Sequence, residues 1–234
     1  MTKQQVLAGI RRGLRRGALT PDQTISLRAR LETHPRHLIP ARSRLPRAEQ
    51  VALFIANLEK EYGTAIRVSD DAAVPEAVAD YLAQQNLAPE IVAAPHPELQ
   101  AIPWSERPML QIRQGRARQA DTVSLQHAFA GIAETGTLML PSAPERPTTL
   151  NLLAETEIVL LRASRIVGAY EEAWDLLRAQ GTGGRLMPRN VMLVTGPSRS
   201  ADIEQTLELG AHGPRRLHVV VIEDDPEARR SPPS

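Results

Sequence analysis

The chain has 234 residues, of which 42% are hydrophobic and 24% charged, the composition of a globular protein rather than a fibre, a disordered polymer or a membrane protein. It has no cysteine, which excludes disulfides, thiolate zinc sites, Cys-ligated iron–sulfur clusters and a sulfur nucleophile. No apolar stretch approaches the roughly 18 residues that cross a bilayer, and the start lacks the apolar core of a signal peptide, so we expect a cytoplasmic protein without a membrane span.

The net charge of +1 conceals an uneven distribution along the chain. Residues 1–50 carry eleven basic and three acidic side chains, whereas residues 51–234 carry seventeen basic and twenty-four acidic ones. This difference predicts two parts of different character. Specific nucleic-acid binding by the basic part is not expected, because residues 1–50 contain no aromatic side chain to stack on a base.

The first part, residues 1–46, begins with a predicted basic amphipathic helix. Thr2 and Gln5 have the spacing of a capping box, and apolar residues then recur with helical period beside arginines. Four prolines follow, so residues 18–46 are expected to form an extended arm with little regular structure.

The second part, residues 47–222, alternates between helical and strand patterns. Helices are predicted from an apolar stripe between Val51 and Tyr62 and at residues 75–85, 169–178 and 200–209. Short apolar runs predict strands at residues 64–68, 90–94, 109–112, 122–125, 137–140, 158–161, 191–195 and 217–222. Several runs are continuous, as expected for strands covered on both faces. We therefore expect an α/β fold with a mainly parallel sheet flanked by helices, and a disordered tail over residues 223–234.

The clearest local motif follows the predicted strand at 191–195. A tight loop there leads into the predicted helix at 200–209, whose free backbone N–H groups and positive dipole end would seat a phosphate or carboxylate. The structural alternative is that Ser200 only caps the helix, with Asp202 supporting its dipole. The candidate ligand-binding residues here are Thr195, Gly196, Pro197, Ser198, Arg199, Ser200 and Asp202.

A second segment, Gly210-Ala-His-Gly-Pro214, closes the same predicted helix. Gly210 suits the position after a helix end, and His212 then stands in a rigid turn before the last strand. Of the six histidines, His212 is the best placed for proton transfer or for binding an anion, beside Gly213 and Pro214. The alternative is a loop histidine that only forms structural hydrogen bonds.

A third segment, Glu134-Thr-Gly-Thr137, leads into an apolar strand. A glutamate in an otherwise apolar run costs free energy unless it is paired or used. Glu134 is therefore a candidate nucleophile or base, with hydroxyls from Thr135 and Thr137, and Gly136 would allow close approach of a ligand. The alternative is a turn glutamate whose carboxylate accepts hydrogen bonds from backbone N–H groups.

These three segments resemble, in this order, the lactate utilisation protein C (LutC/YkgG) family, which carries the LUD domain. The resemblance rests on Ile-Ala-Glu134-Thr-Gly-Thr-Leu, on the stretch from Thr195 to Glu204 and on Gly210-Ala-His-Gly-Pro214, and it spans about residues 50–222. It implies a three-layer α/β/α sandwich of the NagB/RpiA/CoA-transferase-like group. It also implies a role in bacterial oxidation of L-lactate to pyruvate, together with two iron–sulfur partner subunits. Because this chain has no cysteine, it would be the subunit without a cluster.

Three functions remain open from the sequence. The first is a cluster-free subunit that binds a small anion such as lactate or pyruvate in one cleft lined by residues 134–137, 195–202 and 212–214. The second is a scaffold that docks through its basic N-terminal helix onto an acidic partner. The third, by analogy with the fold, is an acyl- or CoA-transferase with Glu134 as nucleophile. No resident cofactor is expected, and no metal site, since His34 and His37 lack carboxylate or thiolate neighbours.

Overall fold

The computed structural model describes all residues except 1, 37, 182–186, 201–207 and 225–234. The chain divides into two units, Met1–Leu38 and Ile39–Ser234. None of the described helices is long and apolar enough to cross a bilayer.

The first unit contains two helices, α1 (Lys3–Gly13) and α2 (Pro21–Thr33). Thr2 and Gln5 form the predicted capping box at the start of α1. The expectation of little regular structure in the arm is wrong over α2. Thr20 and Gln23 form a second capping box there, and Pro21 stands in the first turn, where its missing N–H group is not needed.

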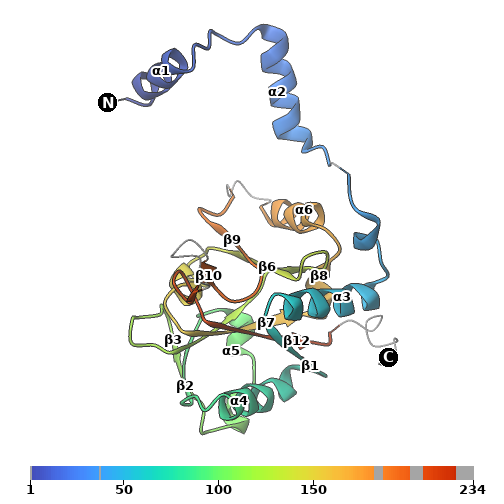
Figure 1. Ribbon diagram of the computed structural model, residues 1–234, viewed down its shortest axis with the longest axis vertical. Coiled ribbons are helices and arrows are strands. Elements are labelled where there is room, and N and C mark those ends of the chain that lie inside the picture. The colour runs from blue at the N-terminus through green and yellow to red at the C-terminus, as the bar shows by residue number, and fades with distance from the viewer. Residues whose placement is uncertain (1, 37, 182–186, 201–207, 225–234) are drawn as a thin grey trace. The chain divides into compact units, whose positions relative to one another are not determined.

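The second unit is built on a six-stranded sheet in the order β1-β12-β7-β4-β2-β3 (Figure 1). Its strands are β1 (Thr64–Val68), β2 (Glu90–Ala93), β3 (Gln111–Gln114), β4 (Val123–His127), β7 (Thr156–Arg162) and β12 (Arg216–Ile222). Every neighbouring pair in this sheet is parallel. The predicted α/β class with a mainly parallel sheet flanked by helices is confirmed.

Helices cover both faces of this sheet, α4 (Val74–Gln84) on one and α3 (Arg47–Lys60) on the other (Figure 1). Successive residues of a strand point to opposite faces, so a continuous apolar run serves both layers. In β7, Ile158 and Leu160 join the core under α4. Val159 and Leu161 join the core that contains Phe54 of α3. The uninterrupted apolar sequence of β7 thus reflects its burial between two helical layers.

A second, four-stranded sheet lies on the α3 side, in the order β8-β5-β6-β9. Its strands are β5 (Ala130–Ile132), β6 (Thr137–Pro141), β8 (Ile166–Val167) and β9 (Val191–Val194). Leu138 and Leu140 of β6 pack toward the large sheet, whereas Met139 packs against Leu177 of α6 (Tyr170–Gln180). The strands predicted at 137–140 and 191–195 therefore exist, but they pair antiparallel in this smaller sheet.

Short elements complete the second unit. They are the helix α5 (Pro97–Gln100) and the 3-10 turns η1 (Ala41–Ser43), η2 (Asp71–Ala73), η3 (Trp104–Glu106), η4 (Thr148–Asn151) and η5 (Ala163–Arg165). The two short strands β10 (Arg199–Ser200) and β11 (Glu208–Leu209) pair antiparallel.

The helix predicted at 200–209 is wrong at both of its described ends. Ser200 is extended and pairs with Glu208, so no helix begins there, and residues 201–207, with Asp202, lie outside the described residues. Gly210 has φ +84° and follows a strand rather than a helix, and its N–H group donates to Ser198 O at 2.9 Å. A left-handed glycine suits the end of a hairpin strand as well as the end of a helix.

Candidate functional site

The first and third predicted segments, at 195–202 and 134–137, meet in a cluster of hydroxyl groups. Oγ1 of Thr137 lies 2.6 Å from Oγ1 of Thr195 and 2.7 Å from Oγ1 of Thr135. The hydroxyl of Tyr170, at the start of α6, lies 2.9 Å from Thr137 and 3.1 Å from Thr135. These four hydroxyls bond to one another, and Thr137 is fully buried. The cluster therefore joins β6, the end of β9 and α6.

The carboxylate of Glu134 lies at the amino end of α6. Its Oε1 accepts a hydrogen bond of 3.3 Å from the backbone N–H of Tyr170, and its Oε2 accepts one of 2.9 Å from the hydroxyl of Ser43. A negative charge is favourable at the amino end of a helix. These contacts match the structural alternative for Glu134, and its role as nucleophile or base stays a prediction.

Gly136 and Gly196 bring their loops onto the last turns of α3. Both have positive φ, +67° and +80°. A Cβ on Gly136 would lie 2.3 Å from the backbone nitrogen of Leu58, and one on Gly196 would lie 2.2 Å from the carbonyl oxygen of Glu61. The close approach that Gly136 allows is therefore an approach to the backbone of α3.

The two C-terminal segments also adjoin. Ser198 donates its N–H to Pro214 O at 2.8 Å, and Ser198 Oγ accepts from the backbone N–H of the exposed His212 at 3.2 Å. The guanidinium of Arg199 pairs with Glu61 and lies 5.1 Å from the centre of the Tyr62 ring. Segment 195–202 thus contacts both other predicted segments. Several of these contacts use hydrogen-bond donors that were expected to bind a ligand.

Two of these segments, at 195–200 and 210–214, lie toward the amino edge of the parallel sheet, whereas Glu134 contacts Gly168 and Tyr170, which follow β7 and β8 in the chain. Gly196 packs on the end of α3, shortly before β1 begins, and Pro214 comes two residues before β12. Thr195 follows β9, which belongs to the smaller sheet. In open α/β sheets, ligands bind outside the carboxyl ends of the parallel strands. That general preference therefore points to the opposite edge of the parallel sheet, away from Thr195.

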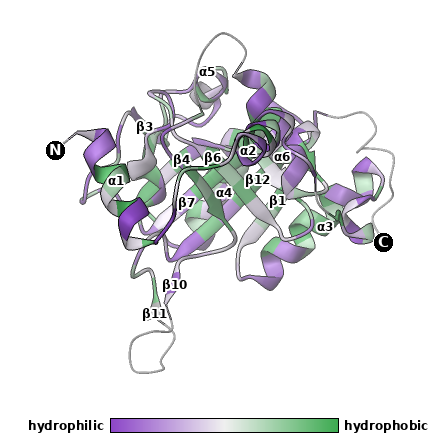
Figure 2. Cartoon of the chain, turned by 90° about the horizontal axis from the view of Figure 1, so that it is seen from above, coloured by the Kyte–Doolittle hydropathy of each residue, from purple (hydrophilic) through white to green (hydrophobic). Residues whose placement is uncertain are grey.

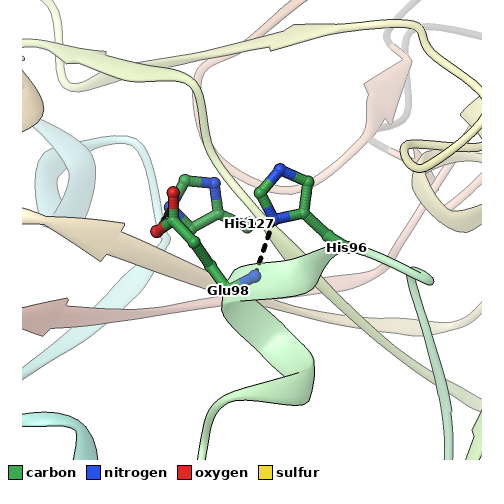
Figure 3. A group of neighbouring side chains, drawn as sticks. All are labelled: His96, Glu98 and His127. Carbon is green, nitrogen blue, oxygen red and sulfur yellow. Dashed lines mark hydrogen bonds and ion pairs between the residues drawn. The ribbon is translucent and has the colours of Figure 1, made fainter.

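The carboxyl edge of the parallel sheet holds a second group of polar residues (Figure 3). His127 is the last residue of β4 and Arg162 the last of β7, while His96 follows β2 and precedes α5, which carries Glu98. We call His96, Glu98, His127, Arg146 and Arg162 the histidine cluster. This cluster was not predicted from the sequence, although His96 and His127 each stand two residues after a predicted strand.

The members of the histidine cluster contact one another closely. The rings of His96 and His127 are stacked, with centroids 5.0 Å apart and planes 6° from parallel (Figure 3). Nε2 of His127 lies 2.8 Å from Oε2 of Glu98, which also accepts from Nε of Arg162 at 2.9 Å. A guanidinium nitrogen of Arg146 lies 3.0 Å from Nε2 of His96. Two histidines, a carboxylate and two guanidiniums thus converge.

The strand order explains why these side chains meet. From β2 the chain runs outward to the edge strand β3, whereas from β4 it continues to β7 on the opposite side. The connections after β2 and β4 therefore leave in opposite directions, which makes the ends of these two neighbouring strands a switch point of the sheet. Such switch points are the usual ligand-binding positions of open α/β sheets.

Burial and neighbouring charges set the protonation of the cluster. Burial is the main cause that lowers the pKa of His96 to about 4, and the nearby Arg146 adds to it. The hydrogen bond from His127 is the largest cause that brings the pKa of Glu98 down to about 2, with a further contribution from Arg162. At neutral pH, His96 is therefore uncharged and Glu98 is ionised.

Two polar atoms of the cluster lack hydrogen-bond partners among the residues that the structure describes. They are Nδ1 of His127 and Nε of Arg146, and both are buried; Nε2 of His127 has only its ion-pair contact with Glu98. A buried polar atom without a partner costs free energy. Together with the switch point at the ends of β2 and β4, these unpartnered atoms favour the histidine cluster as a place where a ligand binds.

Comparisons with known proteins identify the family. The family model of the LUD domain matches residues 51–222. The chain is 44% identical over 98 residues to the uncharacterized protein NMB1437 of Neisseria meningitidis, an alignment that covers 42% of this chain and 41% of that protein. It is 35% identical over 109 residues to lactate utilization protein C of Bacillus licheniformis, covering 47% and 45%. The alignments thus span less than half the length of these curated relatives.

A solved structure agrees with this result. The crystal structure of a DUF162 family protein from Deinococcus radiodurans has a TM-score of 0.56 and 25% identity, and the match covers 76% of this chain and 99% of that one. The family model alone matches well over half of the chain. The resemblance read from the three segments is therefore confirmed, and the chain belongs to the LUD domain family.

Proposed function

We propose that this chain acts in lactate utilisation as a LUD-domain subunit without an iron–sulfur cluster of its own, and that it binds a small carboxylate such as lactate or pyruvate. Relatives named lactate utilization protein C support the choice of pathway. Because the chain has no cysteine to hold a cluster, we assign electron transfer to cytoplasmic partner subunits with iron–sulfur clusters.

The convergence of two buried histidines with Arg146 at the carboxyl edge of the sheet carries the proposal for the ligand. A carboxylate is the natural acceptor for a guanidinium. The hydroxyl or keto oxygen next to that carboxylate would then meet a histidine nitrogen, which donates or accepts according to its protonation. The hydroxyls of Thr135, Thr137 and Thr195 and the guanidinium of Arg199 are instead bonded within the protein, which makes residues 134–137, 195–200 and 212–214 the less favourable place.

Titration of the full chain with lactate and pyruvate by isothermal calorimetry tests this proposal, with Arg146→Gln and Arg199→Gln as matched variants. Both substitutions remove one guanidinium, at the histidine cluster and at the three segments respectively. We expect Arg146→Gln to weaken binding at least about tenfold, the loss of one charge-assisted contact, and Arg199→Gln to leave it unchanged. The reverse pattern would place the ligand at the three segments, and no binding by the unaltered chain would contradict the proposal.

A second candidate function is docking through the first unit. No residue of α1 is buried, and Val6, Leu7, Ile10 and Leu14 are exposed apolar residues beside Arg11 and Arg12. Figure 2 shows this mixture of hydrophobic and hydrophilic residues on α1. An amphipathic helix with an exposed apolar stripe is typical of segments that bind a partner's groove, and the arginines favour an acidic one.

Deletion of residues 1–38 tests the docking function. The deletion ends at residue 38 rather than 46 because Ser43 contacts Glu134 in the second unit. We expect the shortened chain to keep its circular dichroism spectrum and to lose co-purification with the iron–sulfur partner subunits. Unchanged co-purification would contradict docking through α1.

A further inference from the structure

We propose that His96, Glu98 and His127 hold a divalent transition-metal ion at the carboxyl edge of the parallel sheet. One ligand atom from each side chain, a nitrogen of each ring and a carboxylate oxygen, lie within 4.8 Å of one another. Zinc ligands about 2 Å from the metal in tetrahedral geometry lie about 3.4 Å from one another. Coordination requires the stacked rings to rotate until one nitrogen of each ring points at the same ion, together with a shortening of the observed spacing.

The set of donor atoms is suited to such an ion. Two imidazoles and one carboxylate form the protein part of many metal sites that keep open positions for water or another ligand. Imidazole selects transition metals over Mg²⁺ and Ca²⁺, which prefer oxygen ligands. We therefore expect Zn²⁺ and Co²⁺ to bind in preference to Mg²⁺.

Burial and protonation favour coordination as well. His96 and His127 are only 8% and 4% exposed, and Nδ1 of His127 is a buried atom without a hydrogen-bond partner in the described part of the chain. A metal ligand must be a neutral imidazole or an ionised carboxylate. Burial, followed by the charge of Arg146, lowers the pKa of His96, in agreement with a neutral imidazole at that position.

The second shell of the site is present in the same cluster. Arg162 contacts both Glu98 and Asp71, at 2.9 and 3.2 Å, and so fixes the carboxylate that would bind the metal. Such outer contacts orient metal ligands in proteins. Arg146 and Arg162 are accompanied by the carboxylates of Glu98, Asp71 and Glu145, so a bound divalent ion makes the net charge of this group positive, which favours an anion in the open positions.

This charge connects the metal to the carboxylate ligand, in a step that rests on the proposed function. A 2-hydroxy acid can bind one metal ion through its hydroxyl and one carboxylate oxygen, while its second carboxylate oxygen accepts from Arg146. Simple carboxylates such as acetate lack the second metal-binding group. The class of ligand expected for the loaded site is thus a small 2-hydroxy or 2-oxo acid.

Metal binding is measured on the full chain after treatment with a chelator, by calorimetry with Zn²⁺ and by the visible absorption of Co²⁺. We expect one equivalent of either ion, and at least tenfold weaker binding in His127→Gln and Glu98→Gln. His212→Gln, which alters an exposed histidine outside the cluster, is the matched control and keeps the affinity of the unaltered chain. Thermal unfolding of each variant without metal shows whether it still folds, and Glu98→Gln nearly preserves the shape of the side chain.

Two results would overturn the metal site: no binding of one equivalent by the unaltered chain, or equal binding by the cluster variants. A lactate titration of the metal-free and Zn²⁺-loaded chain then separates this inference from the proposed function. Zinc binding without any lactate binding contradicts the proposed function alone. Lactate binding by a chain that takes up no zinc contradicts the metal site alone.

Discussion

Thr137 and Thr195, which stand 58 residues apart in the chain, share a hydrogen bond of 2.6 Å. Thr137 also bonds the hydroxyl of Tyr170, so one buried hydroxyl ties β6 to α6 and to the end of β9. We predict that Thr137→Val lowers the free energy of unfolding by about 1–3 kcal/mol, because it leaves buried hydroxyls without this partner. Urea unfolding measures the loss. Thr137→Ser keeps the hydroxyl and serves as the control, and equal losses in the two variants would contradict the prediction.

Gly136→Ala is expected to be much more damaging than Gly210→Ala. Both glycines have positive φ, +67° and +84°, so backbone strain is similar in the two variants. The new methyl group at Gly136 meets the backbone of α3 at Leu58, whereas that at Gly210 meets the side chain of Arg215, which can move. We expect Gly210→Ala to cost about 1 kcal/mol and Gly136→Ala several times as much. Comparable melting temperatures for the two variants would contradict the prediction and show that α3 moves to accommodate the methyl group.

Glu157 makes the stability of the chain depend on pH. Its side chain is 1% exposed in β7 and accepts a hydrogen bond from Gln126, and burial raises its pKa to about 8. Since this pKa is higher in the folded than in the unfolded chain, its contribution to stability is complete below about pH 4.5 and is lost as the pH rises through 8.

We expect the free energy of unfolding of the unaltered chain to fall by roughly 2–4 kcal/mol between pH 5 and pH 9 because of Glu157, and this fall to be absent in Glu157→Gln. Denaturant unfolding of both proteins at these two pH values measures the effect. The variant should be the more stable protein at pH 9. A variant that loses as much stability with rising pH as the unaltered chain would show that Glu157 is not responsible.

Glu134→Gln distinguishes a capping role from a catalytic one. The amide oxygen of glutamine still accepts from Ser43 or from the N–H group of Tyr170, so only the charge at the amino end of α6 is lost. We expect a loss of about 0.5–1 kcal/mol in stability and full lactate-dependent electron transfer in the presence of the partner subunits. Loss of that activity in a stable variant, or a covalent adduct trapped on Glu134, would favour the transferase hypothesis instead.

The parallel sheet could be predicted from the sequence because its central strands are continuous apolar runs. Ile158 to Leu161 and Val219 to Ile222 are apolar at every position, as burial on both faces requires. The helix α2 could also have been found, since Thr20 and Gln23 repeat the spacing of Thr2 and Gln5. The prolines of the arm led to the prediction of an extended segment, although the capping-box spacing at Thr20 and Gln23 indicated a helix.

The hairpin of β10 and β11 and the histidine cluster were harder to predict, because both depend on which segments become neighbours. Ser200 and Gly210 fit the two ends of a helix as well as a hairpin, and only the pairing of Ser200 with Glu208 decides between them. His96 follows β2 and His127 ends β4, and β3 separates these two strands in the chain but not in the sheet. Sequence periodicity does not contain the order of strands in a sheet.

The stacked histidines make ligand binding a measure of complete folding. His96 and His127 come together only when β4 has paired with β2, so a partly folded chain without this pairing has no binding site. A ligand bound by both histidines, as proposed above, would stabilise only the chain in which β2 and β4 are paired, by about 2.7 kcal/mol when its concentration is a hundred times the dissociation constant. Addition of that ligand would therefore slow proteolysis that proceeds through the unfolded chain.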